Sequence, residues 1–373
     1  MKAMNKISFG LLLLPVLTSA QQAYRLKGTV QNWNGQDTVI MLRFEKNKQI
    51  QDTTIAVNGR FEFKGHLAEP RQVFVYRLDN LHHDRVRDGN SCYIEPGIVT
   101  IQAKDSLRKG TVTSRYVNKD HREITALVQP FLDKILVLRN KAMTLPEEQR
   151  KGAEGQALDK EYRIWIDSIT AIRSRFIRSH PASFISLETL NNMAGVNMQY
   201  HITAPLFKLL TKEIKQTPLG KDFSARLETA ARIVPGALMP LFAALDTTRR
   251  EVKLNDVLKN AKVVLVDFWA SWCKPCRAEN PNIVKAFNAF HEKGFDIISI
   301  SLDDNIDRWK NAIIKDGMPW HHVSGLKKWD EPVAKQLGIS AVPDNFLLDA
   351  QGKVIARGIR GEDLYNKIKE ILQ

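Results

Sequence analysis

The apolar run Val263–Trp269 (VVLVDFW) ends just before a pair of cysteines, Cys273 and Cys276. A continuous apolar run of this length predicts a strand that is buried on both faces of a sheet. Residues 274–291 predict a helix directly after it. The two cysteines therefore lie at a strand-to-helix turn, with Cys273 at the helix N-terminus.

The rest of the C-terminal part continues this alternation. Further strands are predicted at FDIISISLD, NFLLD and KVIARG, and further helices at residues 306–315, 331–337 and 362–372. His321 and His322 are assigned to the end of a loop. This order predicts an α/β domain over residues 236–373, with a mixed sheet and helices on both faces.

The preceding residues show two other patterns. Residues 21–113 contain short apolar runs, and Asn58-Gly59 between TTIAV and RFEFKG predicts a two-residue hairpin. We expect a small all-β domain of antiparallel strands there, with a sandwich-like fold or a barrel. In residues 114–235 apolar side chains recur at helical spacing, which predicts a helical linker region that spaces its neighbours. The run 233–236 (IVPG) marks its end.

The amino terminus has the pattern of a signal peptide. Lys2 and Lys6 precede the apolar run at residues 7–17, and Thr18–Ala20 is a small-residue cleavage site. The apolar run is shorter than the roughly 20 residues that span a bilayer. We expect residues 1–20 to be removed, leaving an exported protein that is soluble in the periplasm or cell envelope.

The net charge of +14 is spread over every part of the chain. Proteins that bind nucleic acid concentrate their positive charge on one surface, so no nucleic-acid partner is expected. A weak attraction to acidic partners or anionic envelope surfaces stays open.

Two cysteines at this spacing are compatible with half of a zinc site, a structural disulfide or a redox-active dithiol. A zinc site needs two more ligands at regular spacing, and the third cysteine, Cys92, lies far away in the β-rich part, where we expect it to be buried. A disulfide that closes so small a loop hardly restricts the unfolded chain. We therefore expect a redox-active Cys273–Cys276 pair, with no metal or other cofactor.

The position of each cysteine predicts its role. Free backbone N–H groups and the positive end of the helix dipole stabilise a thiolate, so Cys273 is predicted to be the nucleophile. Cys276 lies one turn further along the same face, where it is close enough to resolve a mixed disulfide formed at Cys273.

Three stretches resemble thioredoxin-like domains of the TlpA/ResA type, which are extracytoplasmic thiol-disulfide oxidoreductases. They are VDFWASWCKPCRAENP, the Val342-Pro343 pair before NFLLD, and DAQGKVIARGIRGEDL. The resemblance covers about residues 236–373 and implies a thioredoxin fold in which Pro343 is a cis-proline facing the cysteines. The β-rich and helical parts resemble the uncharacterised amino-terminal regions of many exported bacterial proteins.

The resemblance also implies roles for two carboxylates. Asp267 matches the buried acid that assists proton transfer at the second cysteine, and Glu279 matches the extra acid of the ResA-like group. An aspartate inside an apolar strand is costly unless it is used or paired, which agrees with this role. The lysine that thioredoxins carry near the acid is replaced here, at about Ser299. The residues expected to contact substrate are Trp272, Lys274, Pro275 and Val342.

These observations predict an enzyme that reduces protein disulfides and is recharged by a membrane-embedded electron donor. Two alternatives stay open. One is a peroxiredoxin-like peroxidase, although Val266 and Ala270 occupy the positions of the Pro and Thr/Ser that precede the nucleophile in that family. The other is an envelope binding protein in which the thioredoxin-like domain is only a scaffold.

Overall fold

The computed structural model describes residues 21–45, 48–78, 88–195 and 198–373. The predicted signal peptide lies outside these residues. The chain divides into two compact units, and each is described by itself. The first comprises Met1–Phe176, Ala182–Ser186 and Thr211–Leu219, and the second comprises Ile177–Pro181, Leu187–Leu210 and Gly220–Gln373.

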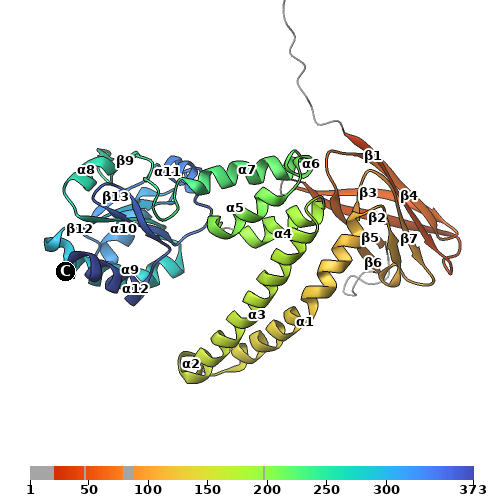
Figure 1. Cartoon of the computed structure of the whole chain (residues 1–373), viewed down its shortest axis with the longest axis horizontal. Coiled ribbons are helices and arrows are strands. Elements are labelled where there is room, and N and C mark those ends of the chain that lie inside the picture. Colours follow the sequence, from red (N-terminus) through yellow and green to blue (C-terminus); the bar gives the residue numbers. More distant parts are fainter. Residues whose placement is uncertain (1–20, 46–47, 79–87, 196–197) are drawn as a thin grey trace, which may run out of the picture. The chain divides into compact units, whose positions relative to one another are not determined.

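The β-rich part of the first unit is built from strands that share one eight-stranded sheet (Figure 1). In chain order they are β1 (Gln22–Val30), β2 (Gln36–Glu45), β3 (Lys48–Val57), β4 (Arg60–Leu67), β5 (Arg71–Arg77), β6 (Gly89–Ile94), β7 (Gly97–Ala103) and β8 (Thr111–Thr113).

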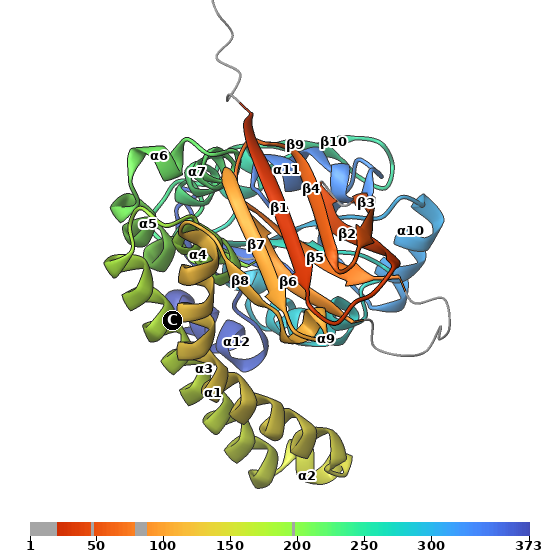
Figure 2. The same ribbon diagram turned by 90° about the vertical axis from the view of Figure 1, so that its right-hand side faces the viewer.

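The strand order is β6-β5-β2-β3-β4-β1-β7-β8. Strand β6, at one edge, also lies against β1, so the sheet folds over itself in a sandwich-like way and encloses an apolar core. Figure 2 shows β1 between β4 and β7. The expectation of antiparallel strands is wrong for β1 and β7, which pair in parallel. Pro96-Gly97 connects β6, at one edge of the sheet, to β7, which is next to the strand at the other edge. The turn therefore does not form a hairpin, because β6 and β7 are not neighbours in the sheet.

The predicted hairpin between β3 and β4 is confirmed. Asn58 and Gly59 both have positive φ angles, of 50° and 71°, which is the conformation that a two-residue hairpin turn requires. A Cβ atom on Gly59 would lie 1.9 Å from the carbonyl oxygen of Val30. Only glycine therefore fits at this position.

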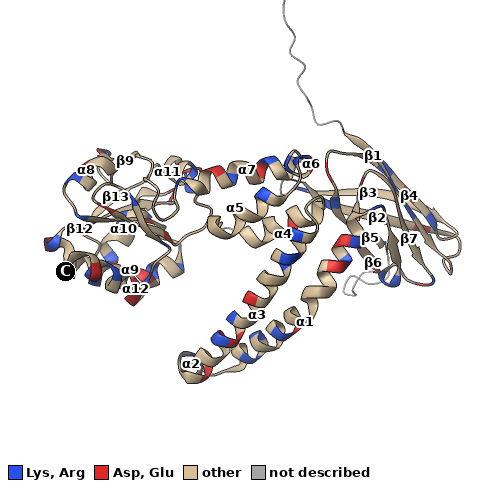
Figure 3. Cartoon of the chain, in the orientation of Figure 1, with Lys and Arg blue, Asp and Glu red and all other residues tan. Residues whose placement is uncertain are grey.

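The helical region, which follows the first sheet in the chain, begins with a long helical pair. Helices α1 and α3 lie side by side in both views (Figures 1 and 2), and the rings of Phe131 and Trp165 are 5.9 Å apart. Figure 3 shows positively and negatively charged residues interspersed along both helices, as expected for amphipathic helices with a solvated face. The helices of the region are α1 (Val117–Thr144), α2 (Glu147–Lys151), α3 (Ala153–Ser179), α4 (Phe184–Ala194), α5 (Tyr200–Leu209), α6 (Lys212–Lys215) and α7 (Pro218–Ala231).

The second unit contains the C-terminal α/β domain. Its strands are β9 (Ala243–Leu245), β10 (Glu251–Lys253), β11 (Val263–Trp269), β12 (Phe295–Ser301), β13 (His321–Val323), β14 (Asp344–Asp349) and β15 (Val354–Arg357). Its helices are α8 (Leu254–Lys259), α9 (Lys274–Phe290), α10 (Ile306–Lys315), α11 (Pro332–Gln336) and α12 (Gly361–Leu372).

Five of these strands form one mixed sheet in the order β13-β12-β11-β14-β15. Strands β13, β12 and β11 are parallel, whereas β14 and β15 are antiparallel to their neighbours. Every residue of the central strand β11 is buried, because strands cover both of its edges and side chains cover both of its faces. This is the thioredoxin-like fold that the sequence resemblance implies.

The assignment of His321 and His322 to a loop is wrong, because both belong to β13 and pair with β12. A strand this short offers too few positions for alternation to be recognised. His322 is buried between the rings of Trp320 and Trp269. Burial lowers the pKa of His322 to about 4, so the imidazole is neutral at pH 7 and packs as part of the core.

In the described parts of the chain, no helix is both long enough and apolar enough to cross a membrane.

Candidate active site

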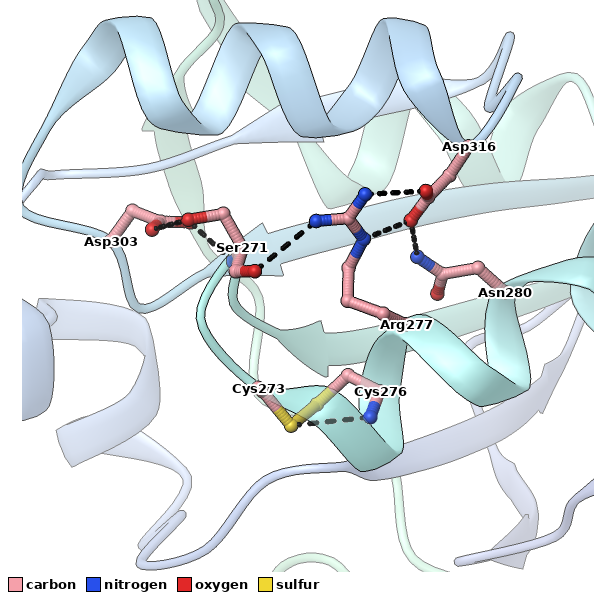
Figure 4. A network of polar contacts seen from close by, with 7 residues as sticks. All are labelled: Ser271, Cys273, Cys276, Arg277, Asn280, Asp303 and Asp316. Carbon is pink, nitrogen blue, oxygen red and sulfur yellow. Dashed lines mark hydrogen bonds and ion pairs between the residues drawn. A yellow bond between two sulfur atoms is a disulfide. The ribbon is translucent and has the colours of Figure 1, made fainter.

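The two predicted cysteines lie where β11 passes into α9, and they form a disulfide with Cα atoms 5.3 Å apart (Figure 4). Cys273 is the N-cap residue of α9. The backbone N–H of Cys276 donates a hydrogen bond to Cys273 Sγ over 3.2 Å. A helix N-terminus that donates to a sulfur in this way favours its thiolate form once the disulfide is reduced.

Both cysteines are close to fully buried in the oxidised form. Cys273 is 5% exposed and Cys276 is 1% exposed, so the two residues differ little in exposure. The clearer difference is chemical, since Cys273 holds the N-cap position and its sulfur accepts the hydrogen bond from the backbone N–H of Cys276.

Asp267 lies inside β11 and is buried. The Ser299 hydroxyl, directly opposite on β12, donates to Asp267 Oδ2 over 3.2 Å. The indole N–H of Trp320 in turn donates to Ser299 Oγ over 2.9 Å. Serine thus occupies the cross-strand position that the sequence assigned to it, and Trp320 fixes its orientation.

The pKa of Asp267 is raised to about 7, and burial is the main cause. The hydrogen bond from Ser299 and the charge of Arg360 oppose this shift, whereas the nearby charges of Asp344 and Glu279 contribute to it. Desolvation disfavours the charged carboxylate, which is why the proton is held so strongly. A carboxyl group with a pKa near neutral exchanges its proton readily at pH 7, as a general acid or base requires.

Glu279 lies on α9 one turn beyond Cys276 and is partly buried. Its Oε1 accepts a hydrogen bond from the backbone N–H of Gly361 over 2.7 Å, and its Oε2 accepts one from Asn282 over 3.0 Å. Glu279 therefore ties the cysteine helix to the start of α12, in addition to lying within electrostatic reach of Asp267.

The peptide bond between Val342 and Pro343 is cis, as the resemblance implies. Because Phe268 pairs with Asp344, Pro343 lies beside the end of β11 that leads to the cysteines. The guanidinium group of Arg360 donates to the carbonyl oxygen of Pro343. The adjacent residues Arg360 and Gly361 thus bind two parts of the site: Arg360 binds the cis-proline and Gly361 binds Glu279.

The residue after the cis-proline is a second buried carboxylate. Asp344 is buried, and its Oδ2 lies 2.7 Å from Nη2 of Arg357 on β15. Sequence reasoning missed this pair. The signal available was a charged residue at the start of an otherwise apolar strand, which requires a partner for the same reason as Asp267.

The residues expected to contact substrate surround the cysteines, but they differ in exposure. Trp272, Lys274 and Pro275 are exposed, and Val342 is partly buried. The neighbouring Trp269 is buried in the core under the turn. Four of these five side chains therefore retain surface at the rim of the site, whereas Trp269 forms its floor.

A polar network that the sequence did not predict fixes the turn before Cys273 (Figure 4). The carboxylate of buried Asp303 accepts hydrogen bonds from the N–H and the hydroxyl of Ser271, and from the hydroxyl of Ser301 over 2.6 Å. Asp303 thereby satisfies the polar groups of a turn that would otherwise be buried without partners.

The same network continues to the other side of the turn. Arg277 donates to the carbonyl oxygen of Ser271 over 3.2 Å and forms a two-pronged ion pair with Asp316 at the end of α10. Asn280 also donates to Asp316, over 2.6 Å. The helix that carries Cys276 is thus tied both to the turn before it and to α10.

The described ranges contain no group of three or more histidine, cysteine, aspartate or glutamate side chains that could hold a metal ion. Cys92 lies on β6 and is buried, as expected. Burial raises the pKa of the Cys92 thiol to about 12, so it stays protonated and unreactive at neutral pH.

Comparison with protein families gives two matches. Residues 235–357 match the AhpC/TSA family, and residues 24–121 match a domain of unknown function, DUF4369. The second match covers the eight-stranded sheet and the start of α1.

Comparison with individual proteins matches the C-terminal part of the chain. The thiol-disulfide oxidoreductase ResA of Bacillus thuringiensis is 30% identical over 138 residues, which are 37% of this chain and 76% of that protein. The thiol:disulfide interchange protein HelX of Rhodobacter capsulatus is 30% identical over 155 residues, which are 40% of this chain and 85% of that protein.

Among solved structures, the thioredoxin domain of a thiol-disulfide oxidoreductase from Bacteroides vulgatus is 36% identical. The match covers 38% of this chain and 99% of that domain, with a TM-score of 0.35.

Proposed function

The chain belongs to the thiol-disulfide oxidoreductase family, and from this premise we propose that it reduces disulfides of other proteins outside the cytoplasm. The observation that carries the proposal is the disulfide at the N-terminus of α9, next to a buried carboxyl group with a pKa of about 7. This arrangement supplies a stabilised thiolate and a proton acceptor at one end of one sheet.

In the proposed reaction, the Cys273 thiolate attacks one sulfur of a substrate disulfide. The substrate S–S bond breaks, a mixed disulfide forms, and the departing substrate thiolate takes up a proton. Asp267 then removes the proton from Cys276, whose thiolate attacks Cys273 Sγ. The second substrate thiol is released and the Cys273–Cys276 disulfide remains, so two electrons have passed from enzyme to substrate.

The oxidised enzyme must be reduced before the next turnover. We propose that a membrane-embedded donor supplies these electrons, since an oxidising compartment offers no pool of reduced glutathione. The location outside the cytoplasm rests on the signal-peptide pattern in residues 1–20. We also propose the division into residues 21–113, 114–235 and 236–373 as β-rich domain, helical region and catalytic domain.

A peroxidase is supported less well. Val266 and Ala270 are buried and aliphatic, so these positions offer no hydroxyl group to a peroxide. The second alternative is a binding protein with an inactive thioredoxin-like scaffold. Such a protein would not catalyse the reduction of a protein disulfide, whereas a reductase would.

We expect the full chain to accelerate the reduction of insulin disulfides by dithiothreitol, because the Cys273–Cys276 pair accepts electrons from the small thiol and passes them to the protein. The measurement is the rate at which reduced insulin B chain precipitates. The variant with both Cys273 and Cys276 changed to serine should give the rate of dithiothreitol alone, whereas Cys92→Ser should behave as wild type. An inactive but folded wild-type chain would favour the scaffold alternative.

A further inference from the structure

A loop beside the active site has an unusual backbone. Residues 324–331, which we call the tryptophan loop, connect β13 to α11. Leu326 and Lys328 in this loop have φ angles of 56° and 51°. Bulky residues rarely adopt the left-handed region, because their Cβ atom is too close to the backbone. Such conformations persist only where the surroundings enforce them, and they gather at functional sites.

Several contacts enforce this conformation. The carboxylate of buried Glu331 accepts a hydrogen bond from the N–H of Gly325 over 2.6 Å. The Ser324 hydroxyl accepts one from the N–H of Leu326 over 3.0 Å, and Lys328 pairs with Asp304 over 2.8 Å. The loop is therefore held at both ends and in its middle.

The loop presents Trp329 to the solvent beside the active site. Trp329 is 45% exposed, and its ring lies 6.3 Å from that of Trp272, which precedes Cys273 and is 46% exposed. The two rings are tilted by 59°. Two half-exposed tryptophans form a costly apolar surface. A strained loop that holds one of them in place indicates that this surface has a use.

The exposed charges beside the two rings are positive. Lys274, next to Cys273, and Lys327, in the tryptophan loop, are exposed, and neither forms an ion pair with a described residue. The charge of Lys327 does act on the neighbouring carboxylates of Asp330 and Glu331, where it favours the ionised form. The two nearby exposed acids are neutralised: Asp304 pairs with Lys328, and Asp330 pairs with Lys335 over 2.5 Å.

We propose that Trp272, Trp329, Lys274 and Lys327 form a docking surface for the disulfide-bearing segment of a partner protein, in which an aromatic side chain lies next to the cysteine and acidic residues flank it. This proposal rests on the proposed function and specifies its substrate. The partner's aromatic ring packs against the two indoles. Aromatic rings in contact have centroid separations of roughly 4.5–7 Å. The flanking carboxylates face the two lysines, which favours encounter with acidic partners over basic ones.

The test uses the reduced full chain and two short peptides, each closed by one disulfide with a phenylalanine beside the first cysteine. Glutamates flank the disulfide in one peptide and lysines in the other. Single-turnover reduction, stopped by acid and analysed by chromatography, gives a half-saturating peptide concentration and a limiting rate. We expect the wild-type chain to be half-saturated at a lower concentration of the glutamate peptide than of the lysine peptide.

Variants separate the aromatic and charged contributions. Trp329→Ala should raise the half-saturating concentration of both peptides about tenfold and leave the limiting rate unchanged, and Trp329→Phe should restore most of the loss. Lys327→Glu should weaken binding of the glutamate peptide about fivefold and strengthen that of the lysine peptide. The matched control is Lys353→Glu, at the turn between β14 and β15, because this turn lies at the opposite end of the sheet from the cysteines. It should change neither value.

A small uncharged disulfide, bis(2-hydroxyethyl) disulfide, distinguishes failure of the docking surface from failure of the chemistry. All variants should reduce it at the wild-type rate. Equal use of the two peptides by wild type, or an unchanged half-saturating concentration in Trp329→Ala, would overturn the docking surface while this small disulfide is still reduced. A wild-type chain that reduces none of the three disulfides would overturn the proposed reductase and the docking surface with it.

Discussion

The Cys276→Ser variant should accumulate one mixed disulfide per chain through Cys273 when it is mixed with an oxidised protein substrate, whereas Cys273→Ser should accumulate none. The reason is the position of the two sulfurs on α9. Cys273 is the N-cap residue, and its sulfur accepts the N–H of residue 276. That bond uses the backbone, so it is retained in the serine variant. Cys276, inside the first turn, lacks this stabilisation.

Mass spectrometry of the non-reduced protein measures the adduct directly. The control is Cys92→Ser, which should neither trap substrate nor alter trapping in the Cys276→Ser background, because burial holds the pKa of the Cys92 thiol at about 12. Equal trapping by the two active-site variants, or trapping only by Cys273→Ser, would show that the assigned roles are wrong.

The Asp267→Asn variant should resolve a mixed disulfide roughly a hundredfold more slowly at neutral pH, which is the lower part of the range for general acid-base catalysis. Asp267 removes the proton of Cys276 only when it is itself ionised. With its pKa raised to about 7 by burial, the wild-type rate of resolution should rise with pH through this value and level off above it. An asparagine carries no such proton, so the inflection near pH 7 should disappear.

Single-turnover kinetics across this pH range measure the effect. Ser299→Ala is the matched comparison, because the hydrogen bond from Ser299 Oγ lowers the pKa of Asp267. Its loss should move the inflection to higher pH while the plateau rate is retained. A pH profile that is the same in wild type and Asp267→Asn would reduce Asp267 to a structural residue.

The parts of the site that the sequence predicted depend on local patterns. The strand β11 was readable because six of its seven positions are apolar, which is typical of a buried strand, and the position of Cys273 followed from the helix directly after it. The burial of Asp267 followed from its place inside that strand. These inferences need only neighbouring residues, which is why the structure agrees with them.

The polar network around Ser271 was not predicted, because its members are brought together by the fold. Asp303 follows the second strand and Asp316 follows the next helix, each more than thirty residues from its partner on the cysteine turn. One signal was available. The carboxyl ends of neighbouring parallel strands meet at the same edge of a sheet, so the Ser301 and Asp303 pair at the end of β12 pointed toward the cysteines.

Other features had no readable signal. The parallel pairing of β1 and β7 depends on where the chain crosses the first sheet, which alternation within a strand does not encode. The conformation of the tryptophan loop depends on the hydrogen bond between Glu331 and Gly325. These two residues lie near opposite ends of the loop and meet only in the folded chain. In both cases the decisive contacts are tertiary.

The cysteine pair is proposed to work as a reductant, and its reduction potential depends on the charges around Cys273. Lys274 and the helix N-terminus stabilise the thiolate and make the pair more oxidising. The carboxylates of Asp267 and Glu279 oppose this effect, since nearby negative charge destabilises a thiolate. No histidine lies between the two cysteines. The balance favours a moderately reducing pair.

The most direct measurement is the reduction potential of the full chain, obtained by equilibration in glutathione buffers and counting of free thiols by alkylation and mass. We expect a value nearer the roughly −270 mV of thioredoxin than the about −120 mV of the strong oxidant DsbA. Lys274→Glu should make the potential more negative, because it replaces a charge that favours the thiolate with one that opposes it. A wild-type value at the oxidising end of this range would contradict the assignment as a reductase and identify the Cys273–Cys276 pair as an oxidant.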